Sequence, residues 1–146
     1  MTSLWRYLLA AVGLAAVLVG VLGVVYLTAP RHSGPDLGRT KPTAGKLFSA
    51  TIAPEGGAVR QGELQNWILT LKTASGAPVE NAAIDISGGM PQHNHGLPTS
   101  PQVTDYLGDG RYRIEGVKFS MSGWWQLRVN ISAAAGSDTV IFNIVL

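Results

Sequence analysis

The sequence contains no cysteine, and this absence removes several classes of site at once. Disulfide scaffolds, thiolate metal centres, lipid-modified cysteine and thiol catalysis all need a residue that the chain does not have. Charge is also scarce, since 14% of the residues are charged against about 25% in an average soluble domain. The length of 146 residues is filled by one ordinary domain and a short extra segment. We therefore exclude a two-domain enzyme and a transporter with many membrane spans.

The missing charge is concentrated near the amino terminus. No charged residue occurs between Arg6 and Arg31. Within this run, Tyr7 to Ala29 would form a helix about 35 Å long, which is enough to cross a hydrocarbon core of roughly 30 Å. We therefore predict a single transmembrane anchor over residues 1–29.

A cleaved signal peptide is the alternative interpretation of the same run. The run exceeds the roughly 7–15 residues of a typical signal-peptide core. Ala29 is also a poor cleavage position, because Pro30 follows it and Leu27 lies at its −3 position. We favour an uncleaved anchor with the amino terminus inside. The C-terminal domain then faces the exterior, because long domains translocate regardless of flanking charge.

Residues 30–46 are rich in proline, glycine and basic side chains, and we interpret them as an extended linker. The net charge is +3 from Arg31 to Lys46 and −2 from Leu47 to Leu146. The pI of about 9.2 therefore describes a basic linker rather than a basic domain. We exclude nucleic acid as a partner, since the folded part has no Lys/Arg cluster. Anionic lipid headgroups are the natural neighbour of the linker, and a merely solvated spacer is the other interpretation.

Residues 47–146 consist of short, β-rich apolar runs separated by turn signals. Trp67, Leu69 and Leu71 alternate with more polar residues, and Asp109-Gly110 is a hairpin signal. No stretch shows helical periodicity with caps. We therefore predict an all-β fold, an immunoglobulin-like β-sandwich of about seven strands. The expected strands lie near 47–53, 65–73, 82–86, 111–119, 124–132 and 139–146.

The tryptophan positions predict which indoles pack in the core. Trp67 and one of the adjacent Trp124 and Trp125 lie on apolar strand faces, so we expect these two indoles to be buried together. The other indole of the adjacent pair then points outward.

Residues 88–98 depart from the sandwich pattern. Two of the three histidines and one of the three methionines fall within six residues. In an extended segment, His93 and His95 project to the same side with Cα atoms about 6.6 Å apart, so their imidazoles can converge on one ion. A turn containing proline would release Met90 to bring a thioether to the same place. Imidazole with thioether favours copper, especially cuprous copper, over zinc, magnesium or calcium.

Two further residues enter this hypothesis. Met121 lies in a polar turn and is a candidate additional ligand, whereas we interpret His32 in the linker as solvated. The alternative is a hydrogen-bonded turn in which Met90 fills the end of the sandwich. Nothing in the sequence spaces a nucleophile for catalysis, so we do not expect an enzyme.

Three blocks of sequence carry a family resemblance. They are Gly89-Met90-Pro91-Gln92-His93-Asn94-His95-Gly96-Leu97-Pro98, Leu107-Gly108-Asp109-Gly110-Arg111-Tyr112, and Val117-Lys118-Phe119-Ser120-Met121-Ser122-Gly123-Trp124-Trp125. Together they resemble the YtkA-like/FixH-type exported domains of bacteria, over roughly Phe48 to Val145. The resemblance implies one N-terminal membrane helix, an immunoglobulin-like sandwich outside the cytoplasmic membrane, and links to copper handling and respiratory-oxidase assembly. It carries over Met90, His93, His95 and Met121 as motif positions.

These observations lead to one functional hypothesis and two alternatives. We expect a membrane-anchored, periplasmic copper-binding accessory or carrier protein that serves a copper enzyme or a respiratory complex. The first alternative is a non-catalytic structural or assembly subunit that docks on a larger membrane complex without binding metal. The second, a copper enzyme, is disfavoured because a domain of about 100 residues offers little room for a substrate cavity.

Overall fold

The computed structural model describes residues 2–28 and 34–146, and within the first range it places the side chains of residues 12–24 and 27. Ala29 and His32 therefore lie outside the described residues. The chain divides into two compact units, 1–34 and 35–146. The described part of the first unit is the helix α1, Thr2–Thr28. Among the described residues, no helix is long and apolar enough to cross a membrane.

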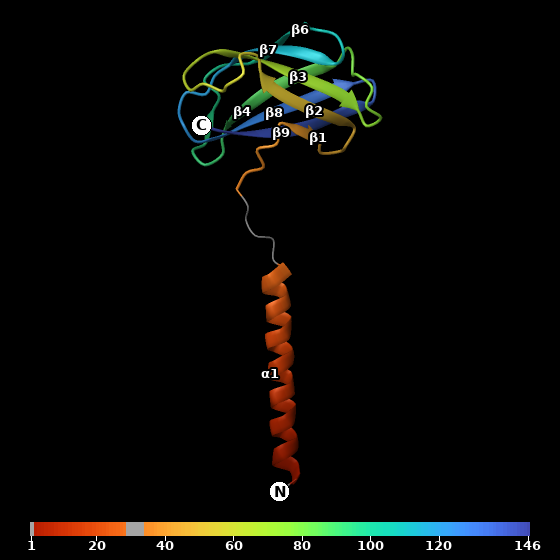
Figure 1. Cartoon of the computed structure of the whole chain (residues 1–146), viewed down its shortest axis with the longest axis vertical. Helices are drawn as coiled ribbons and strands as arrows, with labels where there is room; N and C mark the ends of the chain where they lie inside the picture. Colours follow the sequence, from red (N-terminus) through yellow and green to blue (C-terminus); the bar gives the residue numbers. More distant parts are fainter. Residues whose placement is uncertain (1, 29–33) are drawn as a thin grey trace. The chain divides into compact units, whose positions relative to one another are not determined.

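The second unit is a sandwich of two antiparallel sheets (Figure 1). One sheet has the order β1-β2-β3-β7-β6 and the other the order β5-β4-β8-β9. The strands are β1 Thr40–Pro42, β2 Phe48–Pro54, β3 Gln65–Thr73, β4 Ala83–Met90, β5 His95–Gly96, β6 Gln102–Tyr106, β7 Arg111–Val117, β8 Trp124–Ala133 and β9 Gly136–Val145. No helix occurs between residues 34 and 146, which confirms the all-β prediction for this part of the chain.

The inner faces of the two sheets form one hydrophobic core. In β3, Trp67, Leu69 and Leu71 are fully buried, as their alternation predicts. Trp67 contacts Phe119 with ring centroids 6.1 Å apart, and Phe119 contacts Trp125 at 5.5 Å. We expected Trp67 to be buried together with either Trp124 or Trp125. This expectation is confirmed, and Trp125 is the buried member of that pair.

Tyr112 connects the two sheets at the opposite side of the core. Its hydroxyl donates a hydrogen bond to the Val79 carbonyl at 2.8 Å and accepts one from the Ala82 amide at 3.1 Å. Burial raises the pKa of this phenol, because removal from water disfavours the charged form. Since Tyr112 lies on β7 and Ala82 immediately precedes β4, these bonds fix how β4 enters its sheet.

The start of the domain differs from the predicted boundary at residue 47. The compact unit begins at Pro35, and Thr40–Pro42 form the edge strand β1 instead of an extended linker. Asp138 holds the following turn by accepting hydrogen bonds from the Thr43 hydroxyl at 2.6 Å and from the Gly45 amide at 2.9 Å. Short segments like β1 have too few residues to show an alternating pattern, so the pairing with β2 is visible only in three dimensions.

Candidate metal-binding hairpin

The histidine segment forms a tight β-hairpin at one end of the sandwich. Met90 pairs with His95 and Gly89 pairs with Gly96, so β4 turns directly into β5. The His93 amide donates to the Met90 carbonyl at 3.1 Å, which closes the turn. This geometry corrects the expectation of an extended segment, because only His95 lies in a strand while His93 lies in the turn.

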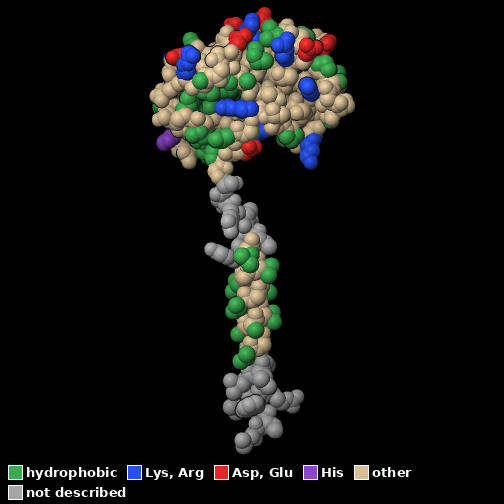
Figure 2. Space-filling view, in the orientation of Figure 1, with side chains coloured by type: hydrophobic (Ala, Val, Ile, Leu, Met, Phe, Trp, Pro, Cys, Tyr) green, Lys and Arg blue, Asp and Glu red, His purple; other side chains and the backbone are tan. Residues whose placement is uncertain are grey.

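The two imidazoles are nevertheless close together. The ring centroids of His93 and His95 are 6.4 Å apart, and the ring planes are tilted by 30°. With metal–nitrogen bonds of about 2 Å, two imidazoles on one ion have centroids roughly 5–6.5 Å apart, the larger value applying to a nearly linear arrangement. Both side chains are exposed, and Figure 2 shows histidine atoms at the rim of the domain beside hydrophobic side chains. The pair is therefore both accessible and suitably spaced for one ion.

Met90 does not lie free beside these imidazoles. It is the last residue of β4 and is 2% exposed, within the hydrophobic core. Its methyl group packs against Gly123, where an added Cβ would lie 2.7 Å from Met90 Cε. The expectation that a turn containing proline releases Met90 is wrong, because its position in β4 directs the side chain inward. Its role as a ligand stays a prediction, and such a role would require the thioether to leave the core.

Met121 is the more accessible thioether. Its side chain is 41% exposed. The Trp125 indole donates a hydrogen bond to the Met121 carbonyl at 3.0 Å, which fixes the turn that precedes β8. Since Gly123 of this turn packs against Met90, and Met90 pairs with His95, the turn and the hairpin lie at the same end of the sandwich.

Metal-binding side chains of the described residues do not form a larger cluster around this pair of histidines. Within residues 2–28 and 34–146, no group of three or more His, Cys, Asp or Glu side chains is placed to hold a metal ion. Next to the hairpin, an open groove of about 360 Å³ is lined in part by His95, Asn94 and Arg128. The sequence pattern did not single out Arg128, which lines this groove because β8 pairs with β4.

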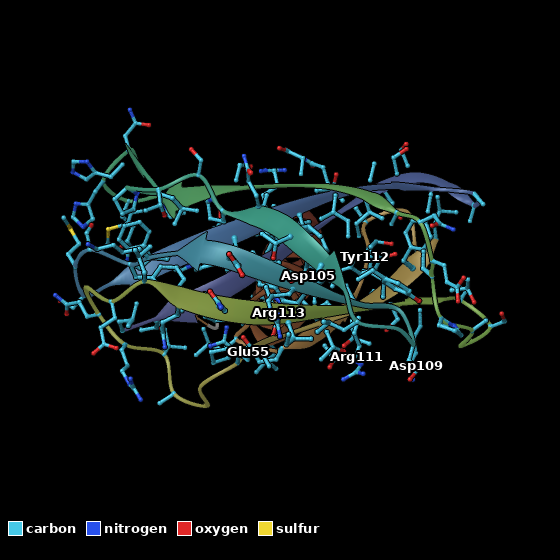
Figure 3. The ribbon with its side chains drawn as sticks, turned by 90° about the horizontal axis from the view of Figure 1, so that it is seen from above. Glu55, Asp105, Asp109, Arg111, Tyr112 and Arg113 are labelled. Atoms are coloured by element: carbon cyan, nitrogen blue, oxygen red, sulfur yellow. The ribbon has the colours of Figure 1, made fainter. Side chains whose placement is uncertain are left out.

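A group of charged residues elsewhere forms ion pairs. On the outer face of the other sheet, Arg113 lies between Glu55 and Asp105, at 3.0 and 3.2 Å respectively (Figure 3). The hydrogen bond to Glu55, with its negative charge, raises the pKa of the Arg113 guanidinium. These exposed pairs connect β7 with its neighbour β6 and, across β3, with the residue that follows β2. They contribute modestly to stability.

A larger open groove of about 620 Å³ lies on the outer face of the sheet that contains β4, β8 and β9. Its polar side chains bond to each other, since Asn130 donates to Asp85 at 3.1 Å and accepts from Thr139 at 3.0 Å. We interpret this row as cross-strand stabilisation of the sheet.

Comparison with known proteins gives one result. A family model described as YtkA-like matches residues 48–130, which is more than half of the chain. The matched range includes the hairpin, the Met121 turn and most of β8. No significant match is found among curated proteins or among solved structures.

Proposed function

Because the chain belongs to the YtkA-like family, we propose that it is a membrane-anchored copper-binding accessory or carrier protein. In this proposal its immunoglobulin-like domain faces the periplasm. Copper is held by the exposed imidazoles of His93 and His95, with Met121 as the thioether ligand. The observation that carries the proposal is the 6.4 Å spacing of the two imidazole rings on one exposed hairpin.

The chemistry of these donors supports copper in the cuprous state. Two neutral imidazoles and a thioether form a borderline-to-soft set that suits Cu(I) better than Mg²⁺ or Ca²⁺, which prefer oxygen. Cuprous copper tolerates low coordination numbers, so two imidazoles in a nearly linear arrangement are sufficient to hold it. Met121 can add a third bond, since its turn lies at the same end of the sandwich and its side chain is exposed.

Exposure of the ligands supports a carrier rather than a catalyst. His93, His95 and Met121 all lie on the surface, where another protein's ligands can approach the ion. An enzyme instead encloses its substrate in a cavity, and the groove beside the hairpin is open and small, at about 360 Å³. Ligand exchange between exposed sites fits the delivery of copper to a recipient enzyme.

The anchor is part of the proposal because no charged residue occurs from Tyr7 to Pro30. The helix α1, Thr2–Thr28, contains one charged residue, Arg6. A tethered domain would work beside the membrane, where a recipient respiratory or other copper enzyme is also held. The partners we propose are therefore the cytoplasmic membrane and a copper-dependent membrane complex.

A docking subunit that binds no metal is the second candidate, and exposed apolar side chains favour it. Leu64 is 66% exposed and Val145 is 52% exposed, in addition to Met121. Exposed apolar side chains of this kind are common at protein–protein contacts, although single ones also occur on ordinary surfaces.

Copper titration of the full chain in detergent micelles, under reducing conditions, separates the two candidates. We expect one Cu(I) per chain, and loss of binding in a variant carrying both His93→Ala and His95→Ala. The matched control is His32→Ala, which removes the remaining histidine and should leave binding unchanged. The circular-dichroism spectrum of the double variant should match the wild type, because both histidines are exposed. Equal copper binding by the wild type and the double variant would favour the docking subunit.

A further inference from the structure

The open groove beside the hairpin has features of a separate binding site. It lies along β4 and β8, and its lining includes Ser87, Gly88, Gly89, Asn94, Gln126 and Arg128. Gln126 and Arg128 alternate with the buried Leu127 and Val129, so they extend from the outer face of the sheet. The groove is thus distinct from the core, and it shares with the imidazole pair the side chain of His95.

The close approach of β4 and β5 leaves one position in the floor of this groove without a side chain. Gly89 lies on the same outer face of β4 as Ser87, and a Cβ there would collide with the carbonyl oxygen of His95. Glycine inside a strand often marks a place where another backbone or a ligand comes close. Here the backbone contact requires glycine, and the absence of a side chain at Gly89 leaves the hollow above it.

The charge of the groove is positive and uncompensated. Arg128 makes no hydrogen bond or ion pair within the described part of the chain, and no Asp or Glu lines the groove. Asp85, two positions before Ser87 on the same face of β4, accepts a hydrogen bond from Asn130 instead of pairing with Arg128. The side-chain amide of Gln126 is held in place, because it donates to Asn143 Oδ1 at 3.1 Å.

We propose that this groove binds a small organic carboxylate, with the Arg128 guanidinium as its anchor. A guanidinium presents a planar pair of N–H donors that matches a carboxylate in a bidentate arrangement. One guanidinium balances the single charge of one carboxylate group, whereas a phosphate near neutral pH carries almost two. The volume of about 360 Å³ lies at the small end of ligand sites, which suits a molecule of a few carbons.

This inference does not rest on metal binding, so it is tested in metal-free buffer. The full chain, isotopically labelled and in detergent micelles, is titrated with propionate and observed by NMR. We expect saturable shifts in the backbone amides of Gly88 and Gly89 and in the Arg128 side-chain Nε–H. Propionamide, which has the same shape without charge, should produce no saturable shift. Inorganic phosphate should bind more weakly than propionate.

Two arginine variants complete the test. Arg128→Gln should weaken propionate binding by about tenfold or more, because it removes the bidentate charged contact. Arg111→Gln, which removes an exposed arginine of the other sheet, should leave the affinity unchanged. Unchanged amide spectra away from the groove confirm that both variants fold. The proposal is overturned by any of three results: absence of saturable shifts with propionate, equal affinity in Arg128→Gln, or phosphate binding more tightly than propionate.

Discussion

Trp67 shows how strongly a single buried side chain supports this small domain. It is 0% exposed and packs edge-on against Phe119, at the end of the core that carries the hairpin. Replacing a buried tryptophan with alanine typically costs about 3–5 kcal/mol, a large share of the roughly 5–15 kcal/mol by which a domain is stable. We predict that Trp67→Ala lowers the thermal unfolding midpoint severely or prevents folding.

The adjacent Trp124 provides the matched control for this prediction. Its indole points outward and donates to Asn143 Oδ1 at 3.0 Å, so Trp124→Ala removes a surface contact and leaves the core filled. Its effect on the unfolding midpoint should be clearly smaller than that of Trp67→Ala. Equal effects of the two substitutions would contradict the assignment of the inner face.

Asp138 makes the stability of the domain dependent on pH. Its pKa lies at about 2, below the ordinary value of 3.8, chiefly because the Thr43 hydroxyl and the Gly45 amide donate hydrogen bonds to the charged form. A carboxyl group with a lowered folded-state pKa stabilises the fold above its unfolded pKa, and this contribution is lost as pH falls toward the folded value. We therefore predict that part of the wild-type stability disappears between about pH 4 and pH 2.

The measurement is the thermal midpoint across that range for the wild type and for Asp138→Asn. The variant should be less stable at pH 6, and its midpoint should fall less between pH 4 and pH 2. Asp109→Asn is the control, because Asp109 is an exposed turn residue and its replacement should leave the wild-type profile intact. Parallel pH profiles for the wild type and Asp138→Asn would show that this carboxylate does not stabilise the turn.

At the scale of the hairpin, the two methionines have different roles. Met90→Ala should destabilise the domain by about 2–5 kcal/mol, because it leaves a cavity where the side chain packs on Gly123. Met121→Ala should change stability by no more than about 0.5 kcal/mol, since the side chain is exposed. Its effect should instead be weaker binding of Cu(I). Denaturant unfolding of both variants without metal measures this difference, and a stable Met90→Ala variant would show that Met90 is not a core residue.

The same elements show what the sequence could predict. Long strands with one buried face, such as β3 and β8, can be predicted from alternating apolar and polar residues, because side chains point to opposite faces along a strand. The strands β1, β5 and β6 were not predicted. The strands β1 and β5 have only three and two residues, and β6 is mostly exposed. Their pairing depends on neighbouring strands that are distant in the sequence.

The candidate site was predictable in composition but not in geometry. The proximity of His93 and His95 in the sequence is sufficient to bring their imidazoles together. The burial of Met90 depends on Gly123, and the position of Arg128 depends on the pairing of β8 with β4. These long-range contacts leave no local pattern, so the sequence left Met90 open between a metal ligand and a residue that fills the end of the sandwich, and it missed the charged groove.

At the scale of the whole molecule, the prediction concerns the membrane. A reporter that is active only outside the cytoplasm should be active when fused after Leu146. The chain should stay in the membrane fraction after an alkaline wash, and mass spectrometry should find residues 1–29 retained. The physical reason is the uncharged run from Tyr7 to Pro30. Recovery of a soluble product that begins near Pro30 or Arg31 would show a cleaved signal peptide instead.

X-ray absorption spectroscopy of the copper-loaded full chain tests the central claim most directly, because it reports the atoms bound to the metal. We predict a Cu(I) edge, outer-shell scattering from two imidazoles, and a sulfur contribution that disappears in Met121→Ala. Copper that is bound without imidazole scattering would contradict the assignment of His93 and His95, and a chain that retains no copper would contradict the account as a whole.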